Sequence, residues 1–448
     1  MDPSYDAGAV AWILASAALV LFMTPGLAFF YGGMVRSKNV LSMLMLNFVC
    51  IGLVSLLWVA GGYALAFGDD VGGGLLGFDA GLLGLGSAEA VEPTGQGEGI
   101  PPILFVAFQM MFAILTPALI SGAVADRVKF GGWVLFVGLW HFLVYAPVAH
   151  WVFDFGDGIG NDGDSGAGWI VGIGALDFAG GTAVHINAGA AALACILVLG
   201  KRRGFGREQM RPHNLPLVLL GAGILWFGWF GFNAGSALGA NGTAAQAFLN
   251  TQVAAAVGAI AWIGVEKLRD GHATTLGIAS GAIAGLVAIT PAAGAVDSLG
   301  AIVVGLLGGG AAVFAVGFKY RLGYDDALDV IGVHLVAGLV GTLAIGLLAT
   351  SEVTGEADGL LHGGGLGLLG AQAAGALGTL AYSFVVSYLL ALLVDKTIGF
   401  RVSEDEEVQG LDQTTHAENG YELTTLGSAG TAMAPTTTGA ALEGKVRA

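Results

Sequence analysis

The sequence predicts an all-α membrane protein with eleven transmembrane helices. We expect an inverted 5+5 repeat with a strapping eleventh helix, the N-terminus outside and the C-terminus in the cytoplasm. Three observations support this fold class. The chain is 55% hydrophobic and only 11% charged, whereas a soluble domain needs about 25% charged residues. Eleven apolar windows are long enough to span a bilayer, and one unusual motif occurs in both halves.

The apolar windows define the expected helices. A transmembrane helix needs about 20 mostly apolar residues. Many of the 77 glycines lie inside such windows, where small residues let helices pack closely in lipid. The predicted spans lie near residues 10–31, 40–67, 102–124, 131–152, 177–199, 215–238, 244–265, 274–292, 298–318, 328–349 and 366–394.

The basic residues indicate the topology. All 17 Lys and Arg residues follow odd-numbered spans, either in the connections or in the tail. The segments after even-numbered spans carry none; these are residues 68–101, 153–176, 239–243, 293–297 and 350–365. The positive-inside rule therefore places the N-terminus outside and the C-terminus in the cytoplasm. We expect a multi-pass protein of the cell membrane.

Other features limit the class further. Cys50 and Cys195 both lie in predicted spans, so no disulfide framework is expected. The N-terminus lacks a basic segment, so the first apolar run is interpreted as a retained helix rather than a signal peptide. No cofactor, metal or nucleic-acid partner is expected, and the chain is not predicted to be an enzyme.

The outer loops are acidic, and two interpretations stand. They could be a solvated surface suited to high salt, as in a halophilic archaeon, or a field that concentrates cations at a pore mouth. Screening within about 10 Å at ordinary salt favours the first interpretation. The acidic residues are Asp69, Asp70, Asp79, Glu89, Glu92 and Glu98 in one loop and Asp154, Asp157, Asp162 and Asp164 in another.

A repeated motif organises the chain. Residues 184–189 read Val-His-Ile-Asn-Ala-Gly and residues 333–338 read Val-His-Leu-Val-Ala-Gly. Each histidine follows an aspartate by eight residues, Asp177 before His185 and Asp326 before His334. Spans 1–5 and spans 6–10 each contain five helices. Because five is an odd number, the second half enters the membrane in the opposite orientation to the first, as an inverted repeat requires.

The predicted organisation follows from that repeat. Residues 1–400 form the membrane domain, with one half at 1–200, the other at 212–350 and the eleventh helix at 366–394. Residues 401–448 form a cytoplasmic tail. Its part at 403–422 is expected to order against the membrane domain, and the part beyond about 423 to be disordered.

The two histidines are the candidate site. A lone buried histidine is more often a satisfied core residue, but ionisable residues inside a membrane usually serve function. Two of them at repeat-related positions favour the functional interpretation. Neutral imidazoles each offer one donor and one acceptor, so a pair can share a proton and present polar atoms to a small molecule. A metal site would require three or four ligands.

Several strings resemble the ammonium transporter (Amt/MEP/Rh) family. The likeness covers residues 177–189 (Asp-Phe-Ala-Gly-Gly-Thr-Ala-Val-His-Ile-Asn-Ala-Gly), 228–237 (Gly-Trp-Phe-Gly-Phe-Asn-Ala-Gly-Ser-Ala) and 332–334 (Gly-Val-His). It extends into the tail at residues 399–404 and 410–412. The resemblance implies a homotrimer in the bilayer, each subunit conducting ammonium or ammonia through a pore lined by His185 and His334.

The resemblance also assigns roles to single residues. It implies that Phe112 and Phe232 form a gate of stacked rings and that Phe108 and Ser236 bind ammonium in the vestibule. Trp229 and Thr290 match pore-flanking positions. Asp177 is interpreted either as a helix cap or as a charge that stabilises a cation in the vestibule.

One departure concerns the pore entrance. Where the family often has a tryptophan that provides a cation–π wall, alignment back from Asp177 places Ser165, and Trp151 or Trp169 could substitute. The tail residues Arg401 and Glu404 resemble the family's tail, which folds under a neighbouring subunit. PII-type signal proteins block the family's pores from this side, and His272 stands at a loop position that is often lysine.

Four other functions compete with ammonium transport. An ammonium sensor that signals through its tail is the main alternative, although no kinase or cyclase domain follows residue 402. A pore for another neutral molecule, such as carbon dioxide or methylamine, is a second. A retinal pump is disfavoured because no lysine lies within a span, and an ion-coupled porter would carry more buried charge.

Overall fold

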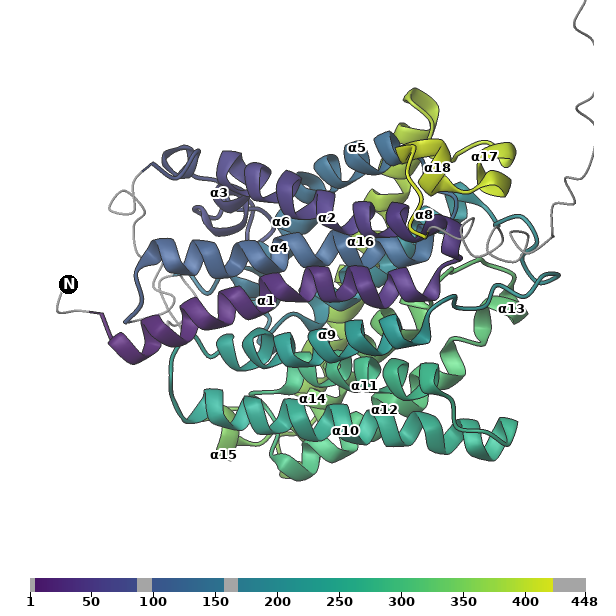
Figure 1. The fold of residues 1–448 in the computed structure, drawn as a ribbon. Coiled ribbons are helices and arrows are strands. Elements are labelled where there is room, and N and C mark those ends of the chain that lie inside the picture. Colours follow the sequence, from purple (N-terminus) through teal and green to yellow (C-terminus); the bar gives the residue numbers. More distant parts are fainter. Residues whose placement is uncertain (1–4, 87–98, 157–167, 422–448) are drawn as a thin grey trace, which may run out of the picture.

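The computed structural model describes residues 5–86, 99–156 and 168–421 of the 448. Figure 1 shows its long helices lying side by side along one common direction. Eleven of the described helices are long and apolar enough to cross a membrane, so the predicted fold class and span count are confirmed. The spans are Ala7–Met34, Ser37–Phe67, Pro102–Val124, Phe130–Phe153, Gly181–Leu199, Leu215–Gly235, Gly242–Asp270, Thr275–Ala292, Ser298–Leu322, Ile331–Leu348 and Gly367–Thr397.

Five spans are single helices and six are built from several elements. The single helices are α1 (Ala7–Met34), α4 (Pro102–Val124), α9 (Leu215–Gly235), α10 (Gly242–Asp270) and α16 (Gly367–Thr397). The composite spans contain η1 (Ser37–Asn39), α2 (Val40–Leu57), η2 (Trp58–Gly62) and α3 (Tyr63–Phe67); α5 (Phe130–Trp140), η4 (His141–Tyr145) and α6 (Ala146–Phe153); η5 (Gly181–Ile186) and α8 (Asn187–Leu199); α11 (Thr275–Ile289) and η6 (Thr290–Ala292); α12 (Ser298–Ala315) and α13 (Phe318–Leu322); and η7 (Ile331–Val336) and α14 (Ala337–Leu348).

Short elements lie between and after the spans. The connections contain η3 (Ala80–Leu82), α7 (Trp169–Gly172), α15 (Ser351–Thr354) and η8 (Leu360–His362), and the tail contains α17 (Glu404–Gln409) and α18 (Leu411–His416).

Three predicted span boundaries lie four or five residues from the observed ones, and one of them is the end of the ninth span, at Leu322 rather than at 318. The fifth span begins at Gly181 rather than at 177, because Gly180 takes the left-handed conformation (φ 111°) and interrupts the helix. The seventh span runs to Asp270 rather than 265. Its last turn carries Lys267 and Arg269, and cations there are stabilised by the helix dipole although they end the apolar window.

Four spans contain a π-helical turn, which the sequence analysis did not predict. The turns are η2, η4, η5 and η7, and the last two carry the histidines of the repeated motif. Extra residues of this kind inside helices occur frequently at functional sites. Uniformly apolar helices show no periodicity from which such a turn could be recognised.

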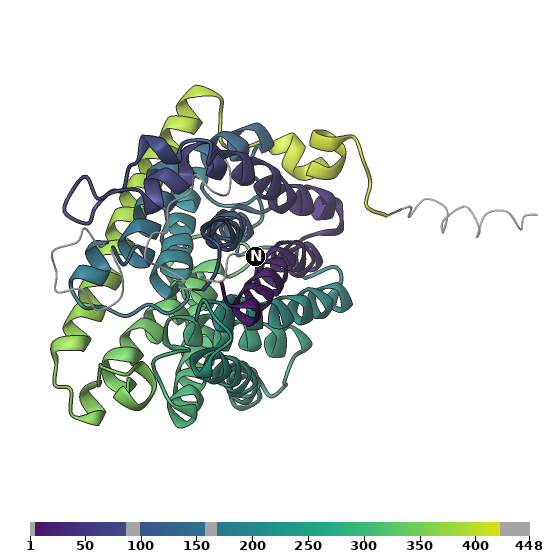
Figure 2. The ribbon, with the colours of Figure 1, turned by 90° about the vertical axis from the view of Figure 1, so that its left-hand side faces the viewer.

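Glycines let the two halves approach closely at the centre of the bundle. The first spans of the halves, α1 and α9, pack along each other. A Cβ on Gly33 of α1 would meet Val218 of α9 at 2.7 Å, and one on Gly231 of α9 would meet Leu19 of α1 at 2.7 Å. In Figure 2 the purple and blue helices of the first half lie above the green helices of the second, and the yellow-green helix α16 runs along the edge beside both halves.

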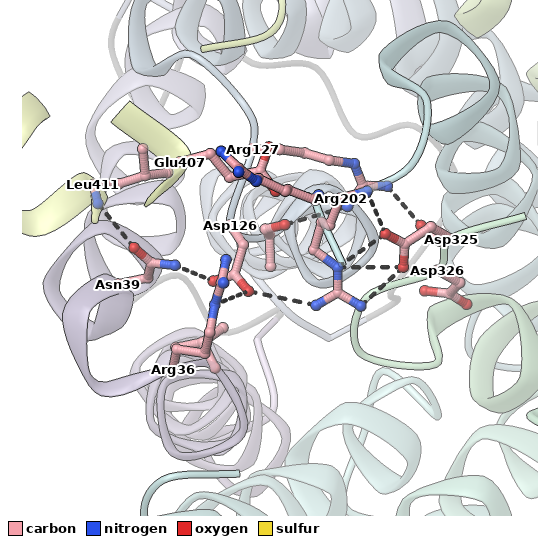
Figure 3. A network of polar contacts seen from close by, with 12 residues as sticks. Arg36, Asn39, Asp126, Arg127, Arg202, Asp325, Asp326, Glu407 and Leu411 are labelled. Carbon is pink, nitrogen blue, oxygen red and sulfur yellow. Dashed lines mark hydrogen bonds and ion pairs between the residues drawn. The ribbon is translucent and has the colours of Figure 1, made fainter. Parts of the chain in front are cut away.

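A buried ionic network joins the connections at one end of the bundle (Figure 3). Arg202 donates from Nη2 to Asp325 Oδ1 at 2.8 Å and lies 3.4 Å from Asp126 Oδ2 through Nη1. Arg36 donates to the same Asp126 oxygen at 3.1 Å. Because these residues follow spans 1, 3, 5 and 9, the basic connections share one end, which we call the basic end.

The described part of the tail lies against the basic end, as Figure 1 shows for α17 and α18. Glu407 accepts a hydrogen bond from Arg401 at 2.8 Å and another from the Arg203 backbone at 2.7 Å. Asn39 accepts from the Leu411 backbone at 2.8 Å. These contacts all lie within one chain. Residues 423–448, predicted to be disordered, lie outside the described residues.

Candidate functional site

The two motif histidines meet in the interior of the bundle. Nδ1 of His185 lies 3.3 Å from Nδ1 of His334, and the rings stack with centroids 5.4 Å apart at 22°. Both are buried, with exposed fractions of 0% and 3%. A hydrogen bond between two Nδ1 atoms requires one ring to donate and the other to accept. The pair can therefore share one proton, and its two Nε2 atoms have opposite hydrogen-bonding roles.

An aspartate in each half organises the turn that carries its histidine. Asp177 Oδ1 accepts from the backbone N–H groups of Gly180 and Gly181 at 2.8 and 2.7 Å, and Oδ2 accepts from both the backbone and hydroxyl of Thr182. Asp326 accepts in the same way from Val330 and Ile331 at the start of η7. Each carboxylate thus satisfies N–H groups that a helix start leaves unpaired.

Burial affects the acidity of both carboxyl groups. It raises the pKa of Asp177, although hydrogen bonds from Thr182, Gly180 and Gly181 partly offset the effect. Burial and the neighbouring Asp329 raise the pKa of Asp326, with Lys319 acting in the opposite direction. Since backbone donors already occupy Asp177, its contacts are those of a helix cap, placed in the turn before η5.

Glycines explain why the two histidine segments can cross. A Cβ on Gly189, four residues after His185, would come within 2.5 Å of the Leu335 Cβ. A Cβ on Gly338, four residues after His334, would come within 3.2 Å of the His185 Cβ. The glycine of each half thus lies against the histidine segment of the other half. This contact explains why a glycine follows each histidine by four residues in the Val-His-X-X-Ala-Gly motif.

Aromatic rings continue from the histidines toward the other end of the bundle. Phe232 lies 6.0 Å from His185, Phe112 lies 4.5 Å from Phe232, and Phe108 lies 5.0 Å from Phe112, between ring centroids. All three phenylalanines are buried. The structure therefore brings the predicted gate pair and Phe108 together with the histidines in one ring column, defined as Phe108, Phe112, Phe232, His185 and His334.

The remaining predicted site residues flank this column. Trp229 stacks on His185 at 5.5 Å and donates from Nε1 to the Thr290 hydroxyl at 2.8 Å. Ser236 ends α9 and donates to the Phe232 carbonyl at 2.8 Å. Its hydroxyl oxygen keeps lone pairs for another donor. Ser236 follows Gly235, against which Phe108 packs.

Phe153 is a further aromatic residue at this site that the sequence analysis missed. It ends α6, and its ring lies 6.3 Å from Phe112. Ser165, the residue expected at the entrance wall, lies outside the described residues. The suggested substitutes Trp151 and Trp169 contact each other, and Trp151 contacts Tyr382 of α16 at 4.7 Å.

The chemistry available here suits a neutral molecule better than a bare ion. The ring column is apolar except for the imidazoles, and His185 Nε2 is buried with no hydrogen-bond partner among the described residues. An isolated charge in such surroundings costs many kcal/mol, whereas a small neutral molecule with hydrogen-bonding atoms costs far less. No group of three or more His, Cys, Asp or Glu residues that could hold a metal occurs in the described part of the chain.

Comparisons with known proteins agree on one family. A profile of the Ammonium Transporter Family matches residues 11–421. An ammonium transporter of Mycobacterium tuberculosis is 54% identical over 439 residues, covering 93% of this chain and 91% of the relative. The crystal structure of Candida albicans Mep2 matches with a TM-score of 0.80 at 34% identity, covering 94% of both chains. A structure described as a sensor Amt protein matches with a TM-score of 0.82 at 30% identity, covering 91% of this chain and 98% of that one.

Proposed function

The chain belongs to the ammonium transporter family, and from this premise we propose how its residues move ammonium. It is a multi-pass protein of the cell membrane, and its membership of this family supports ammonium transport as its function. Ammonium is recruited beside Phe108 and Ser236 and gives up a proton there to water, and that proton either returns to the outer solution or follows along the imidazoles. Ammonia then passes Phe112 and Phe232 and crosses beside His185 and His334.

The observation that carries the proposal is the histidine pair. Two buried imidazoles share one hydrogen bond, and Nε2 of His185 has no hydrogen-bond partner among the residues that the structure describes. A buried polar atom without a partner carries a desolvation cost. Ammonia can relieve that cost because it both donates and accepts hydrogen bonds. The same atoms give an apolar or purely anionic solute nothing comparable.

The aromatic rings explain where the proton is lost. An aromatic face attracts a partly desolvated cation, and the Ser236 oxygen can accept from an N–H of ammonium. Past this point Phe112 and Phe232 make an apolar barrier in which a bare cation is costly. Asp177 acts on this site through the start of η5, because its oxygens already accept from the backbone.

The test is transport by wild-type protein and by a variant that combines His185→Ala with His334→Ala. Methylammonium uptake and ammonium-evoked current in proteoliposomes measure flux, and potassium measures selectivity. We expect the double variant to lose flux or selectivity. Unchanged uptake and selectivity in a folded double variant would refute the pore assignment. Wild-type current evoked by ammonium but not by potassium would show that net charge crosses.

Further parts of the proposal concern the assembly. We propose that the basic end faces the cytoplasm, since basic connections stay on that side, and that the protein forms a homotrimer with one pore per subunit. A PII-type protein would then meet the basic connections and the tail. Cross-linking in membranes tests the trimer, and labelling of single cysteines placed at each end tests the orientation.

Sensing is the second candidate, because one similar structure is described as a sensor Amt protein. A sensor would bind ammonium with little flux. Uptake measured on purified protein separates the two, since a sensor leaves liposomal uptake at the background level.

A further inference from the structure

We propose that Gln372 of α16 is a positioning residue for the histidine pair, holding the turn that begins the His185 segment against the helix that carries His334. This inference rests on the proposed function, since it assigns the pore a determinant outside both repeat halves. It gives α16, the helix left over from the repeat, a specific task in transport.

The first step is the contact with the first half. Gln372 Oε1 accepts from the Leu176 backbone N–H at 2.7 Å, and Nε2 donates to the Leu176 carbonyl at 2.8 Å. The side-chain amide thus pairs with both backbone groups of one residue, as a neighbouring strand would. Leu176 directly precedes Asp177, whose carboxylate accepts from the N–H groups at the start of η5.

The second step is the contact with the other half. The same Nε2 also donates to the Thr342 carbonyl at 3.0 Å. Thr342 lies on α14, the helix that continues from η7 and His334. One side chain therefore bonds the approach to His185 and the helix behind His334, which sit on opposite halves of the repeat.

The third step is burial. Gln372 is 0% exposed and α16 packs on α8, α14 and η5. The bond to Thr342 is buried and the two bonds to Leu176 are partly buried, so loss of the amide leaves these backbone groups with a desolvation cost. Loss of the amide would release the turn before η5, and with it the separation of the two Nδ1 atoms. A displacement of about 1 Å at a reacting site can cost on the order of a hundredfold in rate.

The decisive variant is Gln372→Met, which keeps the length of the side chain and removes every hydrogen bond. We expect its maximal transport rate to fall by roughly tenfold or more, with the half-saturation concentration changed by less than about twofold because Phe108 and Ser236 lie elsewhere. The matched control is Ser387→Ala on the same helix, which removes the buried bond from Trp140 Nε1 at 2.9 Å and should leave the rate unchanged.

A second variant keeps the inference testable if Gln372→Met fails to fold. In Gln372→Glu the ionised carboxylate accepts from Leu176 N–H but cannot donate, whereas the protonated carboxyl group can donate to one carbonyl. Its rate relative to wild type should therefore rise as pH falls. A ratio that does not vary with pH would overturn the inference, as would a folded Gln372→Met protein with the wild-type rate.

The outcomes separate this inference from the proposed function. If the double histidine variant loses transport and the Gln372 variants keep it, the pore assignment stands and the positioning role is wrong. If the double histidine variant transports normally, the pore assignment fails whatever the Gln372 variants do. Loss in both, with Gln372→Met still folded at the assay temperature, supports the two together.

Discussion

Phe153 shows how one side chain can change the entrance of the pore. Its ring lies against Phe112, at the end of α6, and a Cβ on Gly180 would meet its Cζ at 3.3 Å. Phe153 therefore borders both the ring column and the turn that begins η5. A phenylalanine face attracts cations more weakly than a tryptophan face does, so under the proposed function this position would affect how strongly ammonium is held.

The first prediction is that Phe153→Trp lowers the half-saturation concentration for ammonium. A cation–π gain of about 0.5–1 kcal/mol corresponds to a two- to fivefold shift, and Phe153→Ala should shift it in the opposite direction. The measurement is concentration-dependent current in proteoliposomes. Phe227→Ala, at a side chain that is 58% exposed on α9, is the control. Equal half-saturation values for the Trp, Phe and Ala proteins would contradict this role.

The sequence could identify residues whose chemistry is unusual for their surroundings, such as ionisable side chains in apolar spans. Two histidines in apolar spans stand out, and the structure places them 3.3 Å apart. Phe153 and Gln372 could not be found in this way. One is an aromatic residue among 24 phenylalanines, and the other is a polar residue whose role depends on backbone atoms of Leu176 and Thr342 that only folding brings near.

The histidine segments depend on two features of their elements. Each begins with an aspartate that accepts backbone hydrogen bonds, and each carries a glycine four residues after its histidine. The aspartate fixes where the segment starts, and the glycine fixes how near the other segment comes. Together the two features determine the distance between the imidazoles.

The second prediction is that Gly189→Ala damages transport through this crossing. The added Cβ would lie 2.5 Å from Leu335 Cβ and 2.8 Å from its backbone nitrogen, so the segments must separate. Overpacking of this kind costs about 1–3 kcal/mol. We expect a lower melting temperature and at least a roughly tenfold slower maximal rate, measured on the same purified protein.

The control for that prediction is Gly223→Ala on α9. A Cβ there meets nothing within 4 Å, and alanine is the better helix former by about 0.5–1 kcal/mol. Stability should be unchanged or slightly higher, with the wild-type rate. If Gly189→Ala behaved like this control, close approach at the crossing would not matter for the pore.

Helix positions were predictable because lipid requires long apolar segments, but their internal geometry was not. All eleven windows correspond to observed spans. The π-helical turns η5 and η7 add residues within apolar sequence, where every face of the helix is hydrophobic and no periodicity reveals the change. The turn from Asp177 to Gly180 was assigned to the helix because its residues are apolar or small.

Charged and polar side chains link the two halves and the tail at the basic end. Arg202, from the segment between the halves, bonds Asp325 in the second half and Asp126 in the first. Asp126 also binds Asn39, which accepts from Leu411 in the tail (Figure 3). The sequence showed that basic residues gather at this end, but not that Arg202 is only 6% exposed and paired.

The pKa of Asp325 determines the pH range in which this network stabilises the fold. Burial raises the pKa of that carboxyl group, but hydrogen bonds and charge from Arg202 outweigh burial and hold it below the usual value. A carboxyl group with a lowered folded-state pKa stabilises the fold above its unfolded pKa, about 3.9. That contribution is lost as pH falls through the lower folded-state value.

The third prediction follows from the lowered folded-state pKa of Asp325. Near neutral pH, Arg202→Met should lower the free energy of unfolding by about 3–5 kcal/mol, because the buried Asp325 carboxylate loses its guanidinium partner. Combining it with Asp325→Leu should restore part of the loss, since the buried charge is then gone. Thermal unfolding in detergent measures both.

Arg269→Met is the control, because its ion pair with Asp270 is 45% and 50% exposed and such pairs contribute about 0–1 kcal/mol. As pH falls from 7, the gap between wild type and Arg202→Met should narrow, because burial raises the Asp325 pKa once the guanidinium is gone and the variant therefore takes up its proton before the wild type does. A gap that stays constant from pH 7 down to pH 3, or one that widens, would mean that the charge of Asp325 does not hold the two halves together.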